Sequence, residues 1–371
     1  MPSLQISWTR RNAMIGVVLL GLALVLLPFV AGAFGNAWIR ILAFAMLYVM
    51  LALGLNIVVG YAGLLDLGYV AFYAVGAYMY ALLASPHLFE QFEWIRQTFP
   101  DGLHSSIWMV VPLSAALAAL FGVLLGFPVL RLRGDYLAIV TLGFGEIIRI
   151  FLNNLNSPIN FTNGPQGINK IDPVQIGGIS FGKTLDLGFV SLPSVQLYYY
   201  LFLVLTVAVV VISIRLQDSR IGRAWMAIRE DEIAAKAMGI NTRNVKLLAF
   251  AMGASFGGIA GGMFSAMQGF ISPESFVLVE SIMVLAMVVL GGMGNIWGVI
   301  LGAILLSFVP EILRYTVEPL QRAIFGRLLV EPEVIRMLLF GLALVLMMLY
   351  RPAGLWPSRN RRRELTGEPG A

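Results

Sequence analysis

The stretch GGISFGKT, from Gly177 to Thr184, matches the pattern G-x-x-x-x-G-K-[ST] of a phosphate-binding loop. Such a loop binds phosphates only when it lies between a buried strand and a helix whose amino end faces them. The residues that follow here, LDLGFVSLP, contain a glycine and a proline and do not predict a helix. We therefore expect no nucleotide site in this chain. If ATP drives its activity, another chain must bind the ATP.

Cysteine is absent, and the two histidines, His87 and His104, fall in one short connection between apolar stretches. The chain therefore has no disulfide, no thiolate nucleophile and no cysteine-ligated metal. A histidine-based metal site inside a membrane is not expected either. The sequence also lacks a His-Glu-x-x-His zinc motif and a credible pairing of serine with histidine. We expect no catalytic residue, no metal and no cofactor, and a protein that is not itself an enzyme.

A charged segment, GRAWMAIREDEIAAKAMGINTRNVK from Gly222 to Lys246, separates two long apolar runs. Its first part, Ile221 to about Arg229, places apolar residues at helical spacing, namely Ile221, Ala224, Trp225 and Ile228. Asp231 is a suitable N-cap for a second short helix, EIAAKAM, and Gly239 is a suitable end for it. Such a segment can lie on a membrane surface or in a groove of a soluble partner. It can equally be an amphipathic connector between two membrane spans.

The composition identifies the elements that must hold this segment in place. Of 371 residues, 59% are hydrophobic and only 12% are charged, and this charged fraction is about half that of a soluble globular protein. The chain is therefore expected to be an all-α, polytopic bundle of membrane helices that forms one domain over residues 1–371. Apolar stretches long enough to cross a bilayer predict about ten spans: 14–33, 38–59, 66–84, 107–130, 136–152, 197–215, 246–268, 276–291, 296–313 and 334–350.

The positions of the basic residues predict the topology. Lysine and arginine accumulate on the cytoplasmic side of a membrane protein, and one orientation, with both termini in the cytoplasm, satisfies three clusters: Arg131 with Arg133; Arg215, Arg220, Arg223 and Arg229; and Arg351 with Arg359 to Arg363. This orientation makes 216–245 a cytoplasmic loop, 153–196 an external loop, and 357–371 a basic cytoplasmic tail that binds anionic lipid. The distribution of the basic residues matters more than the net charge of +5, and it indicates topology and not a nucleic-acid partner.

Few ionisable residues fall within the predicted spans, and such residues are candidates for a pathway through the membrane. Glu146 and Arg149 are three residues apart, so they share one helical face and can form an ion pair. That pair can serve only to hold helices together. Alternatively, with Asn153 and Asn154, it shapes the outer mouth of a pore. Asn56, near the end of another predicted span, is a further pathway candidate.

Glycines suggest both breaks in the helices and close packing between them. The stretches Val58–Gly68 and Val288–Gly298 each place a glycine-rich break between two apolar runs, as discontinuous helices near a transport pathway do. Short loops that simply use glycine would give the same pattern. In the span 246–268, Gly253, Gly257 and Gly261 are four residues apart, which predicts a face for close helix packing.

Several blocks of the sequence resemble a known family. Permeases of ABC importers carry a cytoplasmic loop helix of the pattern E-A-A-x-x-x-G that docks on an ATPase subunit, and Ala234 to Gly239 resembles its core, with Glu232 one place early. A closer similarity is to the LivM type of permease of high-affinity branched-chain amino acid ABC importers. The blocks that carry it are Gly134–Asn154, Phe161–Ile168, Ile221–Asn241 and Gly291–Ala303.

The resemblance implies the fold of an ABC importer permease in the bacterial inner (plasma) membrane. The expected partners are a second, homologous permease, two ATP-binding subunits, an external binding protein that delivers leucine, isoleucine or valine, and membrane lipids. The residues expected to couple the chain to the ATPases are Arg223, Ile228, Arg229, Glu232, Ala234, Ala235 and Gly239.

Two alternatives remain open on the sequence. One is a related ABC importer permease for urea or short amides. The other is a self-powered secondary transporter or channel, although such carriers use buried carboxylates, and this chain offers few.

Overall fold

The computed structural model describes residues 10–99, 103–130, 132, 134–186, 191–325, 330–351 and 354–356, and helices dominate these ranges. A helix coincides with each of the expected apolar segments: α1 (Arg10–Ala33), α2 (Asn36–Asn56), α3 (Val70–Leu83), α6 (Ile107–Val129), α7 (Asp135–Asn154), α8 (Ser194–Gln217), α11 (Thr242–Gln268), α12 (Leu278–Gly291), α13 (Ile296–Phe325) and α14 (Pro332–Tyr350). Arg131, Arg133 and the tail 357–371 lie outside the described residues.

Not all of these helices are long and apolar enough to cross a membrane by themselves. Within the described ranges, six segments meet both conditions: Asn36–Tyr61, Ile107–Val129, Ser194–Gln217, Thr242–Gln268, Pro273–Gly291 and Ile296–Ile324. Parts of α1, α3 and α14 form shorter apolar helices, and α7 is in neither group. An all-α bundle with several apolar helices is therefore confirmed, whereas the number of about ten spans stays a prediction.

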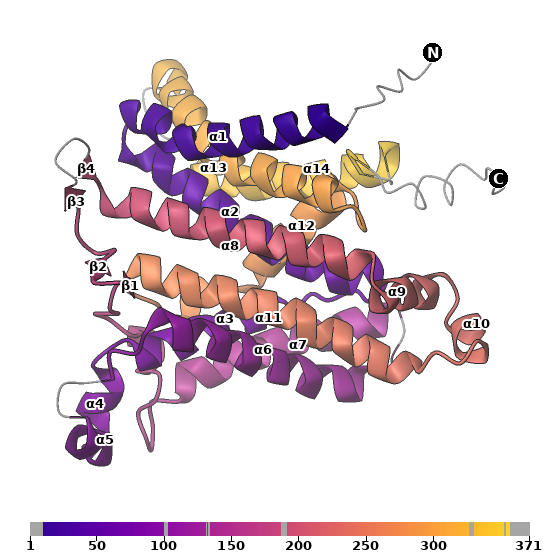
Figure 1. Ribbon diagram of the computed structural model, residues 1–371, viewed down its shortest axis with the longest axis horizontal. Coiled ribbons are helices and arrows are strands. Elements are labelled where there is room, and N and C mark those ends of the chain that lie inside the picture. Colours follow the sequence, from indigo (N-terminus) through magenta and orange to yellow (C-terminus); the bar gives the residue numbers. More distant parts are fainter. Residues whose placement is uncertain are drawn as a thin grey trace.

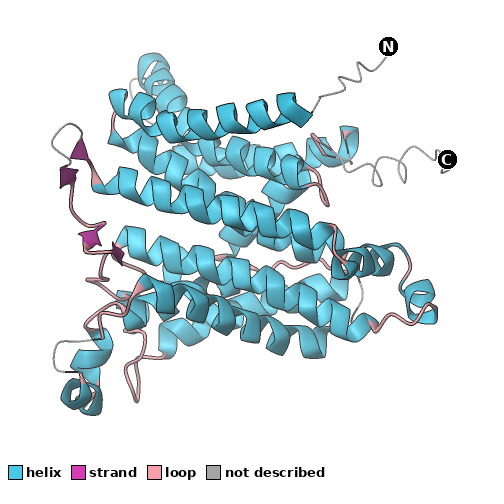
Figure 2. Cartoon of the chain, in the orientation of Figure 1, coloured by secondary structure: helices cyan, strands magenta, loops and turns pink. Residues whose placement is uncertain are grey.

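The long helices lie side by side, and successive ones run in opposite directions (Figure 1). One end of the bundle carries the short helices α9 (Arg220–Glu230) and α10 (Glu232–Ala237), together with the start of α1 and the end of α14. The opposite end carries α4 (His87–Gln91), α5 (Glu93–Thr98) and the few short strands (Figure 2). The predicted loops 216–245 and 153–196 thus lie at opposite ends, as their topology requires.

The match to a phosphate-binding loop falls in this strand region. Two antiparallel hairpins form there: β1 (Gln175–Ile176) pairs with β2 (Ile179–Ser180), and β3 (Leu185–Asp186) pairs with β4 (Ser191–Leu192). Gly177 and Gly178 make the first turn with positive φ, and Thr184 leads directly into β3. A strand, and not the amino end of a helix, therefore follows the GKT sequence directly.

Helix α11 lies at the centre of the bundle, where its small residues let neighbouring backbones approach. A Cβ atom added at Gly261 would lie 2.0 Å from the carbonyl oxygen of Tyr73 in α3. One added at Gly253 would lie 2.6 Å from Val58 Cγ2, and one at Gly257 would lie 3.3 Å from Phe72 Cβ. On another side of α11, a Cβ at Gly258 would meet the Ser114 carbonyl oxygen of α6 at 2.5 Å. The predicted packing face is confirmed.

We expect Gly261→Leu to destabilise the protein, because the added side chain must push α3 away from α11. Overpacking of a tight core typically costs about 1–3 kcal/mol. The measurement is the Tm of the detergent-solubilised protein. Gly143→Leu in α7 is the matched control, since nothing lies within 4 Å of a Cβ at that position. Equal Tm values for the two variants would contradict the close packing.

Candidate functional site

The charged segment forms two short helices whose ends are fixed by local side chains. Ser219 Oγ accepts a hydrogen bond from the backbone nitrogen of Gly222 at 3.1 Å at the start of α9. Asp231 Oδ1 accepts from the nitrogens of Ile233 at 2.8 Å and Ala234 at 3.0 Å at the start of α10. Gly239 has a φ of +86° just beyond α10, a conformation that glycine adopts without strain. The predicted N-cap and the predicted helix end are both confirmed.

Helix α9 packs one face against the bundle. Trp225 is fully buried, and its Nε1 donates a hydrogen bond to the Val245 carbonyl oxygen at 2.7 Å. Ile228 is buried as well, whereas Ile221 is 37% exposed. Arg223 turns back along its own segment and donates to the Asp218 carbonyl oxygen at 2.6 Å. The predicted apolar face is therefore correct except at its first residue.

Helix α10 is held on one side and open on the other. Ala235 is buried, and Glu232 Oε1 lies 2.7 Å from the Nζ of Lys246 in α11. Lys246 is only 7% exposed, so the ion pair fastens α10 to the central helix. Ile233 in α10 and Met238 directly after it are 74% and 84% exposed, so this side of the segment presents two large apolar side chains to its surroundings.

Arg229 connects α9 to a break in a long helix. Helix α2 ends in a π-helical turn, Ile57–Tyr61, and Arg229 Nη1 donates a hydrogen bond to the Gly60 carbonyl oxygen. The aliphatic part of Arg229 covers Gly63, where an added Cβ would lie 2.8 Å from Arg229 Cγ. Gly63 also has a φ of +69°. A close approach and a positive φ together favour glycine at this position.

The two glycine-rich breaks that the sequence singled out lie in contact with each other. Asn56 is 1% exposed, and its Oδ1 accepts a hydrogen bond from the backbone nitrogen of Gly294, between α12 and α13, at 2.8 Å. A Cβ at Gly60 would lie 2.7 Å from the same nitrogen. The chain after α14 also packs here. The backbone nitrogens of Leu355 and Trp356 donate hydrogen bonds to the carbonyl oxygens of Leu290 and Gly291, at the end of α12.

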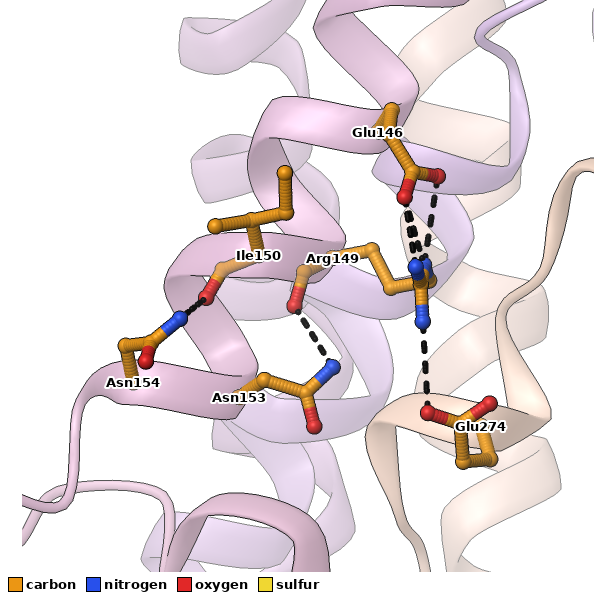
Figure 3. Close-up of polar contacts among 6 residues, drawn as sticks. All are labelled: Glu146, Arg149, Ile150, Asn153, Asn154 and Glu274. Atoms are coloured by element: carbon orange, nitrogen blue, oxygen red, sulfur yellow. Dashed lines mark hydrogen bonds and ion pairs between the residues drawn. The ribbon is translucent and has the colours of Figure 1, made fainter.

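The other candidate residues lie in the second half of α7, and Figure 3 shows them with their polar contacts. Arg149 Nε is 3.1 Å from both carboxylate oxygens of Glu146, as the spacing predicted. Arg149 Nη1 also contacts Glu274 Oε1, at 3.2 Å, and Glu274 was not anticipated. Asn153 and Asn154 donate instead to carbonyl oxygens one turn earlier in their own helix. The ionic cluster therefore consists of Glu146, Arg149 and Glu274.

This cluster is partly open rather than buried in protein. The side chains of Arg149, Glu146 and Glu274 are 26%, 41% and 63% exposed. The candidate residues therefore do not form one site. One group lies on α9 and α10, another lies on α7 toward the opposite end of the bundle, and Asn56 lies at the break after α2. Within the described part of the chain, no group of three or more histidine, aspartate or glutamate side chains could hold a metal ion.

We expect Asn56→Leu to destabilise the protein, because it leaves the buried Gly294 N–H without its acceptor. An unpaired buried donor costs about 1–3 kcal/mol. Asn154→Leu is the matched control, since Asn154 lies at the exposed end of α7 and bonds only to its own helix. Both are compared by the Tm of the detergent-solubilised protein. The contact between the two breaks would be unimportant if Asn56→Leu melted no lower than Asn154→Leu.

Comparison with known proteins identifies the family. Residues 37–348 match the model of the family described as "Branched-chain amino acid transport system / permease component". The chain is 44% identical to the Escherichia coli (strain K12) "High-affinity branched-chain amino acid transport system permease protein LivM", over 98% of this chain and 79% of that protein. It is 28% identical to the "Probable branched-chain amino acid transport permease protein LivM" of Methanocaldococcus jannaschii, over 84% of this chain and 91% of that protein.

More distant relatives carry a different permease name. The chain is 23% identical to the Escherichia coli (strain K12) "High-affinity branched-chain amino acid transport system permease protein LivH", over 70% of this chain and 79% of that protein. No solved structure matches the chain. The match to the family model and the 44% identity to a LivM protein each extend over most of the sequence. The chain therefore belongs to the family of permease components of branched-chain amino acid transport systems.

Proposed function

We propose that this chain is the membrane permease subunit of an ATP-driven importer for branched-chain amino acids. The observation that carries the proposal is the similarity to LivM permeases over nearly the whole chain. The apolar helices agree with a multi-pass protein, which we place in the bacterial inner (plasma) membrane. Relatives named LivM and LivH occur in the same organism, so the second, homologous permease forms the other half of the pore.

The energy for transport comes from partner subunits in this proposal. The GKT sequence does not supply a nucleotide site in this proposal, because the strand β3, and not a helix, directly follows it. Two ATP-binding subunits dock below α9 and α10, at the proposed cytoplasmic end. Ile233 in α10 and Met238 directly after it are the exposed apolar side chains that contact these subunits in the proposal. The residues expected from the sequence, from Arg223 to Gly239, lie on or next to these two helices.

Two contacts of the segment that contains α9 and α10 would transmit the movement of the ATPases to the long helices. In the proposed mechanism, a displacement of α10 is transmitted to α11 by the Glu232–Lys246 ion pair. A displacement of α9 is transmitted to the break after α2 by the hydrogen bond from Arg229 to Gly60. Close packing around α11 lets that helix move nearly as a rigid body. When the ATPases close, both contacts would thus move the chain at the helix breaks. This movement would open the pore alternately to the two sides of the membrane.

The substrate side of the proposal involves the opposite end of the bundle. An external binding protein delivers leucine, isoleucine or valine there, and it makes most of the substrate choice. The α7 cluster of Glu146, Arg149 and Glu274 lies partly open toward this end. We infer that it borders the outer mouth of the pathway, because charged groups at membrane depth avoid lipid and face water or protein.

The direct test of function is uptake of radiolabelled leucine into proteoliposomes that contain the whole assembly. We expect leucine uptake with ATP and none with a non-hydrolysable ATP analogue, and we expect no uptake of radiolabelled urea under either condition. Uptake of urea in place of leucine would indicate an amide importer. Uptake of leucine by the permease alone, without ATPase subunits, would indicate a self-powered transporter.

We expect the double variant Ile233→Asp and Met238→Asp to lose its ATPase subunits on purification. Charged carboxylates replace the two exposed apolar side chains in and directly after α10, while the packed side of the helix is untouched. The measurement is the amount of ATPase that co-purifies with the tagged permease. Ile179→Asp, an exposed position in the hairpin at the opposite end, is the control. If both variants retained their ATPases equally, α10 would not be the docking element.

A further inference from the structure

A cavity of about 470 Å³ lies beside the segment that contains α9 and α10. Its apolar wall consists of Phe127, Pro128 and Leu130, at the end of α6. Its polar wall consists of Glu232 in α10 and of Thr242, Arg243 and Lys246 in the first turns of α11. The cavity is thus placed where the end of a long apolar helix meets the charged end of the bundle.

The charges in this cavity do not balance. Glu232 is matched by Lys246, whose Nζ lies 2.7 Å from its carboxylate. Arg243 has its guanidinium carbon 4.5 Å from the centroid of the Phe127 ring, and no carboxylate pairs with it among the described residues. The cavity therefore carries a net positive charge, held against an aromatic wall. In the sequence, Arg131 and Arg133 follow Leu130 closely, although both lie outside the described residues.

An exposed apolar stripe leads along α6 to the same cavity. Leu120, Leu124 and Phe127 are 53%, 57% and 57% exposed, and their spacing puts them on one face of the helix. On a membrane helix such a stripe contacts acyl chains. A ligand that fits both features has a hydrocarbon chain to lie along α6 and an anionic group to meet Arg243 and Lys246. Basic pockets of this kind at the ends of membrane helices bind the headgroups of anionic lipids.

We propose that this cavity is a binding site for the headgroup of an anionic phospholipid, whose acyl chain lies along the stripe of α6. The phosphate would contact Arg243 and share Lys246 with Glu232. Because the Glu232–Lys246 pair fastens α10 to α11, an occupied site changes how firmly α10 is held. The lipid is then a regulator of coupling as well as an anchor. The binding itself stands without the proposed transport function, whereas its effect on coupling rests on it.

The test is the retention of lipid by the complete assembly, purified in detergent and measured by native mass spectrometry with added phosphatidylglycerol or phosphatidylcholine. We expect the wild type to retain phosphatidylglycerol selectively, and Arg243→Gln to bind it about fivefold more weakly, which corresponds to about 1 kcal/mol for one basic residue. Arg243→Lys should restore most of the binding, because it keeps the charge. Arg351→Gln is the matched control, an exposed arginine at the same end of the bundle.

Two results would overturn the proposal. The first is equal retention of phosphatidylglycerol by the wild type and by Arg243→Gln; if this variant also loses its ATPase subunits, a protein partner covers the cavity instead. The second is displacement of the bound lipid by inorganic phosphate alone, which would mean that the acyl chain contributes nothing.

A second measurement addresses the regulatory part. In proteoliposomes, the amount of leucine taken up per ATP hydrolysed should change with the phosphatidylglycerol content for the wild type and for Arg351→Gln, and should not change for Arg243→Gln. A dependence on lipid that is identical in all three would contradict regulation at this site. An absence of leucine uptake in every sample would count against the transport function instead, and the lipid-binding result would stand.

Discussion

The structure depends on how it satisfies the backbone where two long helices are interrupted. In a lipid environment, free N–H and C=O groups have no water to bind, so irregular chain is tolerated only where protein supplies partners. Here Asn56 accepts from Gly294, Arg229 donates to Gly60, and the chain after α14 donates to the end of α12. One of these partners, Arg229, comes from outside the long helices. The segment that contains α9 therefore completes the bundle and is not merely attached to it.

This arrangement gives a physical reason for transmission from that segment to the bundle. A movement of α9 must either break the contact of Arg229 with Gly60 or carry the break along with it. A movement of α10 acts through the Glu232–Lys246 ion pair, and breaking this pair is costly because the nearly buried charge of Lys246 would remain without its partner. Helix α11, which receives that pair, is packed almost backbone to backbone against α3. In the proposed mechanism, a displacement of α9 or α10 therefore moves α11 and the helix break along with it, because breaking these contacts would cost more free energy.

The sequence predicts those features that depend on neighbouring residues. The helices follow from apolar length, the ends of α10 from Asp231 and Gly239, the Glu146–Arg149 pair from its spacing, and the packing face of α11 from glycines four residues apart. It does not predict the partners that tertiary structure brings together, such as Glu274 with Arg149, Gly60 with Arg229, or Gly294 with Asn56. These pairs are separated by more than a hundred residues, and no local pattern selects one among many polar candidates.

The measurement that tests the central claim most directly is the ratio of leucine taken up to ATP hydrolysed by the reconstituted assembly with Arg229→Ala. Arg220→Ala, at the exposed start of the same helix, serves as the reference. If Arg229 carries the movement of α9 into the helix break, Arg229→Ala will continue to hydrolyse ATP while its uptake falls severalfold, and Arg220→Ala will behave as the wild type. An unchanged ratio in Arg229→Ala, with a properly assembled complex, would contradict the account.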